Sequence, residues 1–111
     1  KLLLRGKNDL YLIDKMYCLF MMERYDEAID IGLQIMAEKE KGIVCFWLAR
    51  SYLALENFLT ALIYMNKSIL LGDCDMWNYY WKSVILENLG RNNEAEITYQ
   101  KAINLGYSED S

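Results

Sequence analysis

Apolar residues recur every three to four positions along this chain, the spacing that gathers them on one face of an α-helix. Glycines, asparagines and charged residues divide the pattern into segments, and the alternation typical of a β-strand persists nowhere. The fifth segment starts near Asp73 or Asp75, either of which suits a helix N-cap. The pattern therefore predicts an all-α chain of six helices joined by short turns, at about 8–23, 26–39, 42–55, 58–71, 73–89 and 93–105.

The last of these helices repeats a pattern that occurs twice earlier in the chain. Ala95 lies 34 residues after Ala61, which lies 33 residues after Ala28, and Gly106 lies 34 residues after Gly72. Each period of about 34 residues contains two predicted helices, and a repeat of this length is typical of a stacked helical array. Because the turns are short, the two helices of each copy should pack antiparallel and share a core with the next copy.

The copies resemble tetratricopeptide repeats, in which a W-x2-L-G-x2-Y segment is followed by A-x3-F and a further small residue. The fragments that carry the resemblance are Leu48-Ala49-x-x-Tyr52, Tyr25-Asp26-Glu27-Ala28-Ile29, and Ala95 with Tyr99 and Ala102. The resemblance implies an α-solenoid of antiparallel helix pairs in a right-handed superhelix. It places three repeats at 7–40, 41–73 and 74–107.

The chain ends and one core position depart from this regular pattern. Residues 1–6 resemble 67–72 and 101–106, where second helices of the repeats end. We therefore expect 1–6 to be the tail of a preceding repeat, so that the chain is a fragment of a longer solenoid, and 108–111 to be a fraying polar tail. Met16 stands where the family has a small residue, so the first helix pair is expected to pack more widely.

Composition narrows the class of partner. The net charge is −4, and the 12 Lys and Arg residues are scattered among 16 Asp and Glu residues, which leaves no basic stripe for nucleic acid. No apolar run approaches the roughly 18–20 residues needed to cross a membrane. Cys18, Cys45 and Cys74 are odd in number and far apart, and the chain has no histidine to complete a zinc site. We expect buried thiols in an intracellular reducing compartment, cytoplasmic or nuclear.

The residue types also argue against catalysis. Without histidine the chain lacks the commonest general base and metal ligand, and it has neither a glycine-rich phosphate loop nor a nucleophile elbow. Carboxylate pairs such as Asp26-Glu27 begin helices, where the helix dipole accounts for them. We expect no enzymatic activity, no cofactor and no metal.

Family resemblance implies that the first helix of each repeat lines a concave groove. The residues at the matching positions form a mostly apolar, aromatic set with one cation: Ile13, Tyr17, Phe20, Phe46, Arg50, Leu53, Trp77, Tyr80 and Val84. These are the candidate protein-binding residues, because aromatic and Arg side chains dominate interface energetics.

Packing is the alternative role for these side chains. Tyr17, Phe46 and Tyr80 suit the core of the array as well as the groove, and Trp47 and Trp81 suit packing better than binding. Arg50 in apolar company needs a carboxylate partner, either a local acid such as Asp14 or an acid on the bound chain.

One kind of ligand is argued against. Tetratricopeptide domains that grip a chaperone's terminal carboxylate use a clamp of Lys and Asn side chains. The matching positions here offer no such donors: they are Ile13, Tyr17, Trp47, Trp77 and Trp81. A co-chaperone role of that type is therefore not expected.

Two functions fit the sequence. The first is a non-catalytic scaffold fragment of a multiprotein-complex subunit, which binds a partner segment in its groove and pairs as a homodimer or stacks on further repeats. The Phe46-Trp47-Leu48-Ala49 stretch resembles repeat subunits of the anaphase-promoting complex, which would place the chain in the cell cycle. The alternative is a small chaperone that shields apolar client peptides, similar to type III secretion chaperones.

Overall fold

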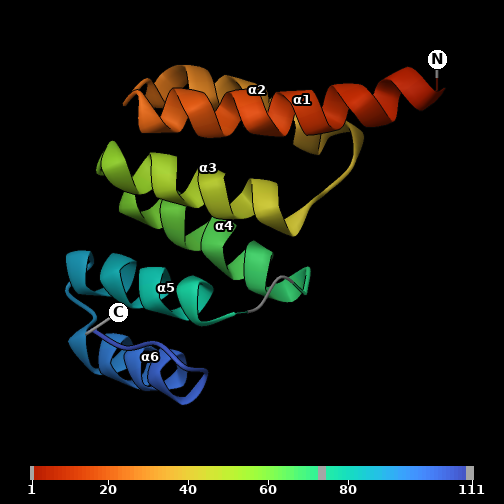
Figure 1. Cartoon of the computed structure of the whole chain (residues 1–111). Helices are drawn as coiled ribbons and strands as arrows, with labels where there is room; N and C mark the ends of the chain where they lie inside the picture. The colour runs from red at the N-terminus through yellow and green to blue at the C-terminus, as the bar shows by residue number, and fades with distance from the viewer. Residues whose placement is uncertain (1, 73–74, 110–111) are drawn as a thin grey trace.

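The computed structural model describes residues 2–72 and 75–109, with side chains from Asp9 onward. Within these ranges the chain consists of α-helices and the turns between them, without a strand (Figure 1). The helices are α1 (Leu2–Met21), α2 (Tyr25–Glu38), α3 (Gly42–Ala54), α4 (Phe58–Leu70), α5 (Met76–Asn88) and α6 (Asn92–Asn104). The predicted all-α class is confirmed.

The helices form three antiparallel pairs that stack in chain order (Figure 1). Each second helix packs against its own partner and against the first helix of the following pair. The first helices also contact one another, α1 with α3 and α3 with α5, so they share one side of the stack. The stack is elongated, with extents of 48 × 26 × 25 Å, and the predicted α-solenoid is confirmed.

Five of the six helices agree closely with the predicted ranges. Asp75 is the N-cap of α5, and its carboxylate accepts hydrogen bonds from the backbone N–H groups of Trp77 (2.9 Å) and Asn78 (3.3 Å). Asp73, the other predicted cap, and Cys74 lie outside the described residues.

The predicted start of the first helix was wrong. Helix α1 begins at Leu2 rather than near Asn8, and it passes through Gly6 without the expected turn. A single glycine inside a helix costs only about 1 kcal/mol relative to alanine, and the leucines, Arg5 and Lys7 around it are good helix formers. The division of the chain at 7–40, 41–73, 74–107 and 108–111 stays a prediction.

The turn inside each pair depends on one residue in the left-handed region. Glu23, Glu56 and Gly90 occupy equivalent positions, with φ of 61°, 62° and 77°. The next N–H then reaches back to a helix carbonyl, as when the N–H of Asn57 donates to the Tyr52 carbonyl at 2.9 Å. This closure reverses the chain and sets the antiparallel pairing.

The unusual Met16 is accommodated by an unusual glycine. Met16 is fully buried, and a Cβ added to Gly32 would lie 2.7 Å from both Met16 Cε and Leu48 Cδ2. The positions equivalent to Gly32 in the later repeats hold Met65 and Tyr99. The first repeat therefore exchanges the large and the small residue between its two helices.

Candidate functional site

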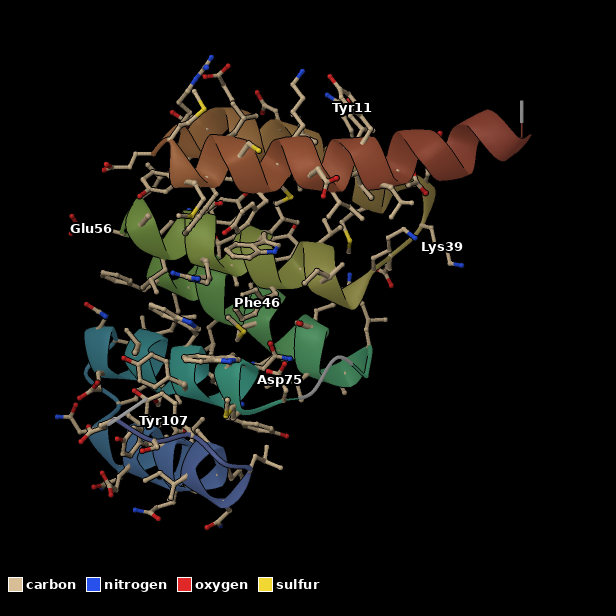
Figure 2. All side chains as sticks on the ribbon, in the orientation of Figure 1. Tyr11, Lys39, Phe46, Glu56, Asp75 and Tyr107 are labelled. Atoms are coloured by element: carbon tan, nitrogen blue, oxygen red, sulfur yellow. The ribbon has the colours of Figure 1, made fainter. Side chains whose placement is uncertain are left out.

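A groove of about 610 Å³ lies between α3 and α5, next to the end of α4. In Figure 2, Phe46 on α3 and Asp75 at the start of α5 mark this region. We call it the Arg50 groove. Its lining residues are Ile43, Phe46, Trp47, Arg50, Ser68, Gly72, Asp75, Trp77, Asn78 and Trp81.

Four aromatic rings surround the guanidinium of Arg50. Its central carbon Cζ lies 4.0 Å from the ring centre of Trp81 and 4.9 Å from that of Phe20. The rings of Trp47 and Phe46, on the same helix as Arg50, are 5.3 and 5.9 Å away. Helices α1, α3 and α5 thus all contribute to one cation–π cluster, in which an aromatic face attracts the positive charge.

The charge of Arg50 is not matched by an acid within the described chain. Burial lowers the pKa of its guanidinium below the usual value, although an arginine keeps its charge at any physiological pH. The ion pairs among the described residues do not involve Arg50, so Asp14, the local acid considered as one of two alternatives, is not its partner. Asp14 is exposed on α1, and the Arg50 side chain is directed among the rings instead.

All three tryptophans of the chain line the Arg50 groove. Trp47 packs edge-on against Tyr17 at 5.0 Å and Phe46 at 5.2 Å, measured between ring centroids. It therefore combines the packing role favoured from the sequence with a place in the groove wall. Trp81 does the same, since it is half-buried beside Arg50.

The other end of the groove is polar. Asp75 is exposed there, with its carboxylate engaged by the first N–H groups of α5. Ser68 is fully buried and donates a hydrogen bond to the carbonyl of Gly42 at 2.9 Å, which ties α4 to the start of α3. The groove consequently has a cation at one end, a carboxylate at the other and apolar walls between them.

The candidate residues from the sequence divide into three groups. Phe46, Arg50 and Trp77 line the Arg50 groove, and Phe20 reaches it through Arg50. Tyr17 borders Trp47 on the exposed side of α1.

The remaining candidates lie elsewhere. Ile13 and Leu53 pack against the two hydrophobic core clusters, and Val84 is half-buried outside the groove lining. Tyr80 stacks on Tyr107, with ring centroids 4.5 Å apart. The sequence did not single out Ser68, Asn78 or Asp75 as groove residues, because their proximity depends on how the pairs stack.

A tyrosine cluster covers the adjoining surface of α5 and α6 (Figure 2). Tyr107 contacts Tyr80, Tyr99 and the groove residue Trp77, whose ring centroid is 5.6 Å from that of Tyr107. The Tyr99 hydroxyl donates to Glu109 at 2.8 Å, and this hydrogen bond raises the pKa of Tyr99 to about 12. The segment after α6 therefore packs back onto the last helix pair.

Metal-binding and membrane-spanning features are absent from the described residues. No group of three or more His, Cys, Asp or Glu side chains there has the arrangement of a metal site, and none of the described helices is long and apolar enough to span a membrane. The thiol of Cys45 is buried, as expected. Cys18 on α1 is exposed, contrary to expectation.

Comparison with known proteins identifies the repeat. Residues 78–105 match the tetratricopeptide repeat family model. The first tetratricopeptide domain of Spaghetti (RPAP3), bound to the HSP90 peptide SRMEEVD, superposes with a TM-score of 0.83 at 25% identity, covering 90% of this chain and 80% of that one. The second domain of the same protein, bound to the same peptide, has a TM-score of 0.86 at 18% identity, over 93% and 90% of the two chains. A search of curated proteins finds no match.

Proposed function

Because the chain has the tetratricopeptide-repeat fold, we propose that it is a non-catalytic protein-binding module whose Arg50 groove holds a segment of a partner protein. The fold is generally a scaffold for protein interactions, and the similar RPAP3 domain binds a peptide. The observation that carries the proposal is Arg50 itself. It is a half-buried cation with aromatic neighbours and no acid partner among the described residues, at the wall of an open groove.

The tryptophans provide a direct test. Since Trp47, Trp77 and Trp81 are the only tryptophans and all line the groove, their fluorescence reports on that surface alone. Peptides without tryptophan, selected from a random display library on the 111-residue chain, should change the emission on binding. Substitution of Phe46 and Arg50 together should abolish the change while helicity by circular dichroism is preserved.

A matched control lies outside the groove. Leu59 and Ile63 on α4 are exposed apolar residues outside the groove lining, and their double substitution by serine should leave binding intact. Peptides that bind equally well to the Phe46/Arg50 variant would place the binding surface elsewhere and contradict the proposal.

A second surface favours stacking on another helix. Tyr11 on α1 is 63% exposed, whereas the equivalent Val44 and Asn78 are 0% and 2% exposed, against the preceding helix pair. Cys18 is likewise exposed where its equivalent Ser51 is fully buried. Figure 2 shows Tyr11 at the outer edge of the stack. This face supports the proposal that α1 packs against a further repeat or a second copy of the chain.

Sedimentation over a range of concentrations separates these two occupants. A homodimer through α1 should dissociate when Tyr11 is replaced by Glu, because the charge would be buried without a partner. A monomer at every concentration excludes the second copy and leaves a further repeat as the occupant.

The finer roles stay proposals. A subunit of a multiprotein complex accounts for both the groove and the exposed face of α1, whereas the comparisons give no support to an anaphase-promoting complex or a cell-cycle role. The alternative, a chaperone for apolar peptides, predicts that the chain suppresses aggregation of an unfolded apolar client. The exposed free thiol of Cys18 is consistent with the proposed location in an intracellular reducing compartment, cytoplasmic or nuclear.

A further inference from the structure

From the charges and shape of the Arg50 groove, we infer that it selects an internal segment with a single acidic side chain next to a large apolar one, the acid binding Arg50. This inference rests on the proposed function, because it specifies the chemistry of the bound segment. It concerns an Asp or Glu side chain within a chain, not a terminal carboxylate.

The N–H groups of Arg50 have no hydrogen-bond acceptor among the described residues. Its neighbours Phe20, Phe46, Trp47 and Trp81 attract the charge, but aromatic carbon offers no strong acceptor for N–H groups. In the described part of the chain no fully buried side-chain nitrogen lacks a hydrogen-bond partner. Arg50 has no such hydrogen-bond partner among the described residues, so its nitrogens reach the solvent of the groove. A carboxylate of the bound segment can accept two of these N–H groups at once.

The charged residues of the groove lining limit how much negative charge a bound segment can carry. Among the described lining residues, Arg50 is the one cation and Asp75 the one carboxylate. A phosphate group carries nearly two negative charges, and a run of acids carries more, so either would add more negative charge than Arg50 can neutralise to a groove that already holds Asp75. A single carboxylate neutralises Arg50 at its own end of the groove and adds the least negative charge.

An apolar wall lies beside Arg50 in the groove. Ile43 is 42% exposed and Trp77 is 43% exposed, and both line the groove with Phe46. Burial of apolar surface is favourable, so a large side chain laid against this wall supplies the main attraction. The acid then fixes the register, because only one position in the groove satisfies Arg50.

The SRMEEVD peptide of the similar structures makes a useful contrast. It carries three acidic side chains in addition to its terminal carboxylate. The described lining of the Arg50 groove contains one cation, Arg50, and one carboxylate, Asp75. The positions that match the Lys and Asn clamp hold apolar or aromatic side chains. We expect this peptide to bind far more weakly than an internal segment with one acid.

Calorimetry on peptides selected from the random library tests the inference. The tightest groove-binding peptide should contain one Asp or Glu next to a large apolar residue, and replacing that acid by its amide should weaken binding about tenfold or more. Arg50→Gln should weaken the acidic peptide to a similar extent but leave its amide form nearly unchanged, whereas Arg50→Lys should retain part of the affinity because it keeps the charge. Arg91→Gln, which removes an exposed ion-paired arginine outside the groove, should have no effect.

The possible results are distinguishable. If no selected peptide changes the tryptophan emission, the proposed function and the inference both fail. If peptides bind the groove but carry no acid, or lose nothing on amide replacement, the inference fails while the proposed function stands. SRMEEVD binding as tightly as the selected peptides would overturn the preference for a single internal acid. Circular dichroism melts of each arginine variant establish that it is folded.

Discussion

Replacing Gly32 by alanine tests how the first repeat is packed. Alanine is the better helix former, so the change should stabilise α2 by about 1 kcal/mol if nothing else mattered. The added Cβ would however lie 2.7 Å from Leu48 Cδ2 and 2.9 Å from Leu48 Cγ, as well as 2.7 Å from Met16 Cε. These distances are too short for carbon contacts, and all three residues are in the closed interior of the stack.

The size of the effect follows from which atoms can move. Met16 Cε is the end of a flexible side chain, whereas Leu48 Cγ lies close to the backbone of α3 and can yield only if the side chain or helix shifts. Overpacking of this kind costs about 1–3 kcal/mol. After the gain in helix propensity is subtracted, we expect Gly32→Ala to lower the free energy of unfolding by about 0–2 kcal/mol.

Urea unfolding followed by circular dichroism measures this directly, and a double-mutant cycle identifies the cause. Met16→Ala alone should cost about 2–5 kcal/mol, but Gly32→Ala added to it should cost at least about 1 kcal/mol less than in the parent chain. Ala37→Gly, an exposed site on the same helix, gives the propensity term alone. A stabilising Gly32→Ala, or strictly additive free energies with Met16→Ala, would refute the exchange of large and small residues.

Two further changes test the turn and the tyrosine cluster. Glu56→Gly should raise the free energy of unfolding by about 0.5–1 kcal/mol in thermal melts, because the φ of 62° at Glu56 disfavours a side chain. The reverse change, Gly90→Glu, should lower the free energy of unfolding. If both changes shift the stability equally, the turn positions are not strained by a side chain. The folded chain holds the Tyr99 proton to about pH 12, whereas an unfolded tyrosine releases its proton near pH 10, so stability should be full below pH ~10 and fall as pH rises toward 12. Tyrosinate absorbance, compared with Tyr99→Phe, should show this late titration, and Glu109→Gln should bring it back toward pH ~10; a titration unaffected by Glu109→Gln would exclude that hydrogen bond as its cause.

The helices were predictable because they depend on local patterns. Apolar spacing, the cap at Asp75 and the recurrence of Ala28, Ala61 and Ala95 are visible in the sequence and determine five helices closely. The start of α1 was missed because residues 1–6 were compared with 67–72 and 101–106, where later helices end. A likeness of six residues does not reveal whether a glycine ends a helix or lies inside one.

The groove was predictable only in part, since its walls come from different repeats. The positions that match the family indicated Phe46, Arg50 and Trp77, which line the same groove. They did not reveal that Trp81 would lie 4.0 Å from the Arg50 guanidinium, because this distance is set by the stacking of α5 on α3. Of the two acid partners considered for Arg50, the local one, Asp14, forms no ion pair with it among the described residues, and the sequence alone could not decide this because the two residues lie on different helices.

The overall charge of the chain bears on what the groove can bind. With a net charge of −4, the molecule repels acidic segments at long range, and this repulsion grows with each acid that a segment carries. The attraction of Arg50 is strongest at contact, where a bound carboxylate displaces groove solvent beside the aromatic rings. A segment with one acid therefore forms the contact with Arg50 against little long-range repulsion. An acidic run is repelled several times more strongly but still meets the same single cation. The distribution of charge thus favours the same kind of segment as the shape of the groove does: mostly apolar, with one carboxylate placed to meet Arg50.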